Sequence, residues 1–191
     1  MKVYGRQDIM ENYMKIFLLF LFLIQSVGYA EINAIEEEIL ADNIRNFYKV
    51  SDGIYRSAQP DRKNMELMDI IGVKTVINLR RYHSDMNEAK NTSLKLERVK
   101  MNPGKIKDED IAEILTLIKN SDKPVLIHCW HGSDRTGVVV AMYRIVFEGF
   151  SKEEAIKELR EEKYGHHENI YGNIVKYIRN VDVEKLKTKI L

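Results

Sequence analysis

The single cysteine of this 191-residue chain, Cys129, lies in the segment HCWHGSDRTG at positions 128–137. An apolar run precedes this segment and another follows it. One cysteine excludes both an intramolecular disulfide and a cysteine-rich metal site. The thiol is therefore either a buried apolar side chain or a reactive group.

The residues around Cys129 are suited to binding a phosphate. The run KPVLIHC predicts a buried strand, and RTGVVVAMYRIVFEGF predicts a central helix. The loop between them must pass the N-terminus of that helix, where free N–H groups favour an anion and the thiolate form of a cysteine. Gly132 allows a tight loop, and the planar guanidinium of Arg135 matches two phosphate oxygens. The segment predicts a phosphate site with a nucleophile at its base.

The rest of the chain alternates strand-like and helix-like segments. The helix predicted at 108–120 has an apolar face, the one at 61–72 lies between an aspartate and a glycine, and the one that follows Ser151 opens with a capping box completed by Glu154. Strands are predicted at 53–57, 73–79, 95–101 and 123–129. This order predicts a single α/β domain with a central, mostly parallel four- to five-stranded sheet flanked by helices.

The first 30 residues have the pattern of a secretory signal peptide. Lys15 precedes an apolar run at 16–24, and a small-residue ending follows at Ala30. That run is too short to span a hydrocarbon core of ~30 Å. We therefore expect residues 1–30 to be removed, residues 31–191 to form a periplasmic or secreted domain, and no stable membrane span to remain.

The charges of the chain are balanced. Without residues 1–30, 27 basic and 27 acidic residues remain. Such a balance gives no overall field that would attract nucleic acid, so no nucleic-acid partner is expected. A monomer is expected.

The segment VLIHCWHGSDRTG resembles the Cys-x5-Arg signature of the protein tyrosine phosphatase superfamily. GIYRSAQP and GVKTVINLR extend the resemblance, over most of residues 45–180, to small bacterial dual-specificity-like phosphatases. It implies hydrolysis of phosphomonoesters through a phosphocysteine intermediate, without a metal or other cofactor. The implied substrate is a phosphorylated protein or a small phosphorylated molecule.

The resemblance also implies roles for individual residues. Cys129 would be the nucleophile and Arg135 the phosphate clamp, while the backbone amides of the loop would bind the remaining phosphate oxygens. His128 would order the loop, and the hydroxyl of Thr136 would assist the thiolate or the leaving step. The substrate-binding set is Trp130, His131, Gly132, Ser133 and Thr136.

The proton donor for the leaving group is less clearly marked. Asp134 directly precedes Arg135, a pairing also found in myotubularin-type lipid phosphatases, and it is the favoured candidate. Asp108 and Asp110 are the alternatives, although acids in the first turn of a helix are expected from the helix dipole alone.

Several features leave alternatives open. Arg56, Ser57 and Gln59 either line the pocket or form a turn, and the adjacent His166 and His167 are interpreted as loop residues near the substrate. A phosphoinositide or inositol-phosphate phosphatase is the alternative function. A phosphate-binding module without catalysis is the alternative of another class.

Overall fold

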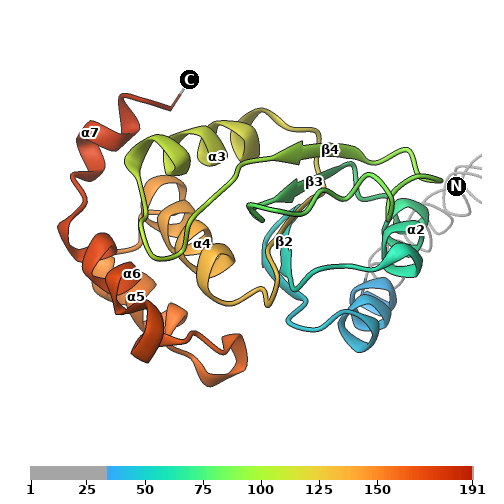
Figure 1. Cartoon of the computed structure of the whole chain (residues 1–191), viewed down its shortest axis with the longest axis horizontal. Helices are drawn as coiled ribbons and strands as arrows, with labels where there is room; N and C mark the ends of the chain where they lie inside the picture. The colour runs from blue at the N-terminus through green and yellow to red at the C-terminus, as the bar shows by residue number, and fades with distance from the viewer. Residues whose placement is uncertain (1–33, 191) are drawn as a thin grey trace, which may run out of the picture. The chain divides into compact units, whose positions relative to one another are not determined.

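The computed structural model describes residues 34–190, and Figure 1 shows its arrangement. The chain divides into two units, residues 1–39 and 40–191. Residues 34–39 of the first unit are helical, and every element named below belongs to the second. The predicted signal segment lies outside the described residues. None of the helices within residues 34–190 combines the length and apolar character that a membrane crossing needs.

A five-stranded sheet forms the centre of the second unit, in the order β1-β2-β5-β3-β4. β1 and β2 pair antiparallel, and all other neighbours are parallel. This confirms the predicted mostly parallel sheet. The strands are β1 (Tyr48–Ser51), β2 (Ile54–Ser57), β3 (Thr75–Asn78), β4 (Lys95–Arg98) and β5 (Val125–His128).

Helices cover both faces of the sheet, because the central strands are apolar on both sides. Val125 and Ile127 of β5 belong to one core cluster, and Leu126 between them belongs to the other. One face packs against α2 (Arg62–Ile71) and residues 40–47. The other packs against five helices, which Figure 1 shows together on one side: α3 (Asp108–Asn120), α4 (Asp134–Phe147), α5 (Lys152–Leu159), α6 (Glu168–Asn180) and α7 (Val183–Lys187).

The helix that follows Cys129 is the most buried element on its face. Every residue of α4 from Thr136 to Met142 is buried, as its uninterrupted apolar sequence predicted. Each fully buried aliphatic side chain of this kind contributes ~1.5–3 kcal/mol relative to exposure. Burial therefore fixes the N-terminus of α4 at the end of β5, close to where the chemistry is expected.

The predicted helix ends are also confirmed. The Asp61 carboxylate accepts a hydrogen bond from the Asn64 N–H, and Gly72 ends α2 in the left-handed conformation. Ser151 and Glu154 form the predicted capping box. These local signals are independent of the site, and they set the boundaries of the elements that carry it.

Candidate active site

Three parallel strands end side by side at the edge of the sheet that carries Cys129. Ser57 of β2 and Asn78 of β3 both pair with His128, the last residue of β5. The segments that follow these residues must therefore converge, as expected at the carboxyl edge of an open α/β sheet. The loop of residues 129–133 that leads to α4, here called the cysteine loop, lies between the other two segments.

Gly132 allows the cysteine loop to close around the thiol. Its φ angle is +74°, and a Cβ atom there would lie 2.6 Å from the backbone of Ser57 and Ala58. Its N–H donates a hydrogen bond to Cys129 Sγ over 3.2 Å. Cys129 is itself buried. No other residue type fits this position without displacing β2.

The carbonyl groups of the cysteine loop are bound on the outside of the loop. The Gln59 N–H donates to Trp130 O at 3.1 Å, Asn46 Nδ2 to His131 O at 2.7 Å, and Arg56 Nη2 to Gly132 O at 2.8 Å. In a trans peptide the next N–H points opposite to the carbonyl. The N–H groups of residues 131–133 therefore point inward, where an anion can accept them.

The Arg56 side chain holds this arrangement from behind, whereas the Ser57 hydroxyl bonds within its own segment. The buried Arg56 guanidinium stacks on the Tyr164 ring at 4.1 Å while it donates to Gly132. Ser57 Oγ donates to Ala58 O at 2.7 Å. Arg56, Ser57 and Gln59, which the sequence placed either in the pocket or in a turn, are thus positioned behind the cysteine loop.

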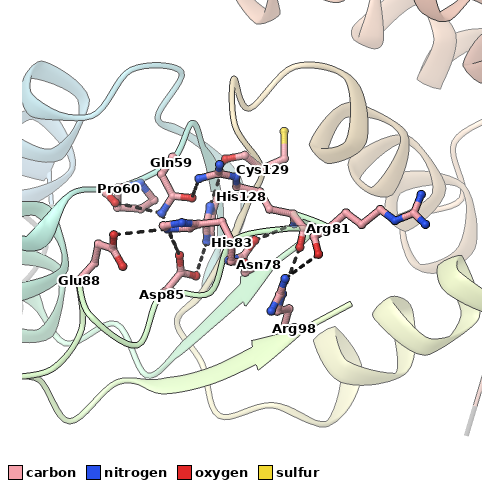
Figure 2. Close-up of polar contacts among 11 residues, drawn as sticks. Gln59, Pro60, Asn78, Arg81, His83, Asp85, Glu88, Arg98, His128 and Cys129 are labelled. Atoms are coloured by element: carbon pink, nitrogen blue, oxygen red, sulfur yellow. Dashed lines mark hydrogen bonds and ion pairs between the residues drawn. The ribbon is translucent and has the colours of Figure 1, made fainter. Parts of the chain in front are cut away.

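A buried hydrogen-bond network fixes the residue before the nucleophile (Figure 2). His128 Nε2 lies 2.8 Å from Asp85 Oδ2, and His128 Nδ1 lies 3.2 Å from Cys129 O. Gln59 Nε2 donates to the other oxygen of Asp85 at 2.9 Å. Burial alone would raise the pKa of Asp85, but the hydrogen bonds from His128 and Gln59 outweigh it and lower the pKa. The structure thus supplies a partner for His128 that the sequence did not reveal.

A cavity of about 490 Å³ opens above Cys129. Five of the predicted site residues line it together with residues from other segments. The lining includes Cys129, Trp130, His131, Asp134 and Arg135, and also Arg80, Arg81, Tyr82, Asn102, His167, Ile170 and Tyr171.

Arginines give this cavity a positive character. Arg135 Nη1 contacts Leu79 O at 3.4 Å, which holds its guanidinium beside the end of β3. Arg80 stacks on the Trp130 ring at 4.3 Å and donates to Gln59 Oε1 at 2.9 Å. Burial and the charge of Arg135 together lower the pKa of Arg80. These contacts orient two cations toward one site, and Arg81 adds a third at the rim.

Asp134 is held by two histidines. Its Oδ1 accepts from His166 Nδ1 and from the His167 N–H, both at 2.9 Å, and its Oδ2 lies 2.8 Å from His167 Nδ1. Burial would raise the pKa of Asp134, but these hydrogen bonds prevail and lower it to about 2. The carboxylate is therefore an anion at neutral pH. That Asp134 itself donates the proton stays a prediction, and its low pKa weighs against it.

The alternative aspartates lie away from the cavity lining. Asp108 accepts a hydrogen bond from the Tyr177 hydroxyl at 2.9 Å, between α3 and α6. Asp110 lies in the same first turn of α3, where burial raises its pKa. Among the residues described, neither lines the cavity with Cys129.

Two predicted hydroxyl residues lie on the α4 side of the cysteine loop. Ser133 Oγ is 3.3 Å from Asn46 Nδ2 and is buried. Thr136 is buried, and within residues 34–190 its Oγ1 has no hydrogen-bond partner. That free hydroxyl leaves room for the predicted contact with the thiolate, which stays a prediction.

Within residues 34–190, two groups of side chains have the composition of a metal site, His131–Asp134–His167 and His83–Asp85–Glu88. In the first, His167 Nδ1 and Asp134 Oδ2 are only 2.8 Å apart. Two tetrahedral zinc ligands at ~2.1 Å from the ion would be separated by about 3.4 Å. The short contact is therefore a hydrogen bond, so this group as arranged is better suited to proton transfer than to metal binding.

Cys129 lies under inward-pointing amides at the N-terminus of α4, with Arg135 beside it, and this arrangement is suited to binding a phosphate next to a nucleophile. Residues 43–190 match the model of the tyrosine phosphatase family, and the chain belongs to this family.

Comparison with individual proteins supports the same assignment. The dual specificity protein phosphatase TpbA of Pseudomonas aeruginosa is 29% identical over 144 residues, which are 74% of this chain and 65%, less than two thirds, of that protein. The inositol diphosphatase DSP4 of Arabidopsis thaliana is 32% identical over 108 residues, 52% of this chain and 54% of the relative.

Solved structures of two proteins named as phosphatases resemble the fold of this chain. The crystal structure of P. aeruginosa TpbA in complex with pTyr has a TM-score of 0.69 at 28% identity and covers 76% of this chain and 90% of that chain. The catalytic core of the PP-IP phosphatase SIW14 from S. cerevisiae has a TM-score of 0.65 at 26% identity. This match covers 75% of the present chain and 89% of the SIW14 core.

Proposed function

We propose that this chain hydrolyses phosphomonoesters through a phosphocysteine intermediate on Cys129. The observation that carries the proposal is the cysteine loop: the Gly132 N–H donates to the sulfur, and the outward carbonyls turn the amides of residues 131–133 toward the same point. Preorganised donors of this kind stabilise charge that develops in a transition state.

In the proposed reaction, Cys129 Sγ attacks phosphorus as the bond from phosphorus to the leaving oxygen breaks. Arg135 and the loop amides bind the three equatorial oxygens, whose charge they stabilise. Water then attacks the phosphocysteine, inorganic phosphate leaves, and the thiolate is restored. Each step uses groups of this chain, so no added metal is needed.

We propose phosphotyrosine-type and other dual-specificity substrates as the main class. The rim of the cavity exposes Trp130, Tyr82 and Ile170, which can pack against an aryl group beyond the phosphate. The similarity to TpbA, whose structure was solved with pTyr, supports this choice. The domain would act as a monomer.

A second substrate class is favoured by a specific observation. Arg80 and Arg81 line the same cavity as Arg135, which is more positive charge than one phosphate requires. Inositol diphosphatases are among the relatives, and an inositol phosphate carries several phosphates on one small ring. For this class, Arg81→Ala should lower kcat/KM for an inositol pyrophosphate more than for a phosphotyrosine peptide. Equal effects would favour the first class.

The test of the proposed function is metal-independent turnover of 4-nitrophenyl phosphate. Activity should persist in excess chelator, vanadate should inhibit it, and Cys129→Ser should remove it. Loss of activity in chelator, or turnover by the serine variant, would contradict the proposal.

We also propose that residues 1–30 direct export and that the mature chain begins at Glu31. The support is the order of Lys15, the apolar run at 16–24 and Ala30 in the sequence. Mass spectrometry of the periplasmic and medium fractions of an expressing bacterium should find a chain starting at Glu31. An intact chain confined to the cytoplasm would contradict it.

A further inference from the structure

The cavity needs a proton source that the phosphate-binding residues do not provide. When the bond from phosphorus to oxygen breaks, the leaving oxygen gains a negative charge, and an alcohol or ordinary phenol leaves well only if it is protonated. Among the described lining residues, Asp134 is the one carboxylate, and it is held as an anion by three hydrogen bonds. Asn102, which also lines the cavity, carries an amide that has no acidic proton.

The two histidines bound to Asp134 differ in their access to the cavity. The His166 side chain is 2% exposed, and within residues 34–190 its Nε2 has no partner, so its ring is enclosed. The His167 side chain is 42% exposed and lines the cavity with Cys129 and Arg135. Because His167 contacts Asp134 through Nδ1, its Nε2 lies on the far side of the ring.

We propose that His167 is the proton donor to the leaving group and that Asp134 positions it. This rests on the proposed phosphatase function. A carboxylate that accepts from Nδ1–H holds an imidazole in one tautomer and orientation and stabilises its protonated form. Histidine is also the side chain that most readily gains and loses a proton near neutral pH.

The proton that His167 gives up when the phosphocysteine forms is returned when the phosphocysteine is hydrolysed. In the first step, Cys129 Sγ bonds to phosphorus, the electron pair of the broken bond goes to the leaving oxygen, and that oxygen takes the proton from His167 Nε2. His167 is then neutral and keeps Nδ1–H on Asp134. In the second step, a water molecule gives a proton to His167 Nε2 as its oxygen bonds to phosphorus. The bond from phosphorus to Cys129 Sγ breaks, its electron pair returns to the sulfur as the thiolate, and inorganic phosphate leaves, which restores the starting state.

Other titratable groups lie around the His167 ring. His131 lies 5.4 Å away between ring centroids, and burial, the charge of Arg45 and the proximity of His167 lower its pKa. Arg135 is a permanent cation in the same cavity. His166 contacts Oδ1 of Asp134, the oxygen that His167 Nδ1 does not use. Of the two histidines among the described lining residues, His167 is the one whose ring is bonded to Asp134.

The experiment compares kcat/KM for two substrates that differ in the leaving group. Because kcat/KM covers only the steps up to the phosphocysteine, it reports the donation even if hydrolysis limits turnover. For a phosphotyrosine peptide, whose phenol is weakly acidic, His167→Asn should lower kcat/KM by ~10²–10⁴-fold. For 4-nitrophenyl phosphate, whose phenol is acidic, the loss should be much smaller. The basic limb of the wild-type pH profile should also flatten in this variant.

Asp134→Asn tests the positioning role. It should produce the same leaving-group-selective defect, and the double variant should lose little more than His167→Asn alone, because the two residues act as one unit. Full additivity would show that Asp134 acts independently of His167 and would overturn that part of the proposal. Vanadate binding by each variant, measured by calorimetry, shows whether the cavity remains folded, and His167→Gln provides a second amide if the Asn variant does not fold.

Three other outcomes would overturn the proposal. The first is an equal loss for both substrates in His167→Asn and His167→Gln, which would indicate a structural role. The second is a selective loss in His131→Asn or Tyr171→Phe, which would identify a different donor in the lining. The third is loss of wild-type activity in chelator restored by zinc, which would assign the histidines to a metal and would contradict the proposed metal-independent mechanism as well. Failure of the phosphatase function itself would look different, because the wild type would then hydrolyse neither substrate.

Discussion

The two walls of the cavity are built in different ways. The phosphate wall is one continuous segment, Cys129 to Arg135, and buried side chains behind it fix its geometry. The other wall is the rest of the lining, which includes Asn102 from the segment after β4, and His167 and Tyr171 from around the start of α6. We therefore expect phosphate binding to depend on one short segment, whereas the proposed leaving-group chemistry depends on how distant segments meet.

The largest effect is expected on the phosphate wall, from Arg135→Lys. Lysine keeps the charge but loses the planar pair of donors that matches two phosphate oxygens. We expect kcat/KM for 4-nitrophenyl phosphate to fall by ~10²–10³-fold, as when one transition-state donor is lost. Arg62→Lys, outside this cavity, is the control and should retain the wild-type value. A retained rate in Arg135→Lys would show that point charge alone suffices.

The backbone of the same wall is tested by Gly132→Ala. A Cβ atom there meets Ser57 and Ala58 at 2.6 Å, and the φ angle of +74° disfavours any side chain. We expect the free energy of unfolding to fall by ~1–3 kcal/mol, together with a loss of activity. Gly172→Ala is the matched control, because nothing lies within 4 Å of its Cβ position. It should leave stability unchanged or raise it by up to ~1 kcal/mol. Similar destabilisation in both variants would contradict the steric argument.

A smaller and pH-dependent effect is expected behind the phosphate wall, from Asp85→Asn. The pKa of Asp85 is lowered in the folded protein, so its contribution to stability is present above its unfolded pKa and is lost as the pH falls through the folded value. At pH 7 we expect the variant to lose ~1–3 kcal/mol of unfolding free energy, typical of a hydrogen bond to a charged group. The difference from wild type should shrink below about pH 4.

Urea denaturation at several pH values measures this effect. Asp52→Asn is the control, because its carboxylate is fully exposed beside Lys49 and should contribute nothing measurable. If the difference in the free energy of unfolding between wild type and Asp85→Asn stayed constant down to pH 3, the ionised carboxylate could not be its cause.

The contrast between the walls also explains what the sequence could predict. The helices and strands could be predicted from their hydrophobic periods, from the caps at Asp61 and Ser151 and from the helix end at Gly72. The phosphate wall could be predicted from the spacing between Cys129 and Arg135. Each of these signals is local in the sequence. Asp85 was not predicted, because its pairing with His128 spans 43 residues. His167 was only placed near the substrate, because its contact with Asp134 depends on how the segment before α6 packs against α4.

The positions of the aspartates show the same limit. Asp108 and Asp134 both open a helix, so the sequence offers each as an acid near a positive helix end. In the fold, Asp108 pairs with Tyr177 away from the cavity, and Asp134 faces two histidines at its edge. Charge at a helix start is visible in the sequence, but its neighbours on other elements are not.

In the proposed mechanism, Cys129 carries the phosphoryl group during turnover. The most direct measurement is mass spectrometry of the protein after the reaction with 4-nitrophenyl phosphate is quenched in acid within the first turnover. We expect a mass increase of one phosphoryl group, located on the peptide that contains Cys129 and missing from the Cys129→Ser variant. A phosphoryl group on another residue, or rapid product formation with Cys129 unmodified throughout the first turnover, would contradict it.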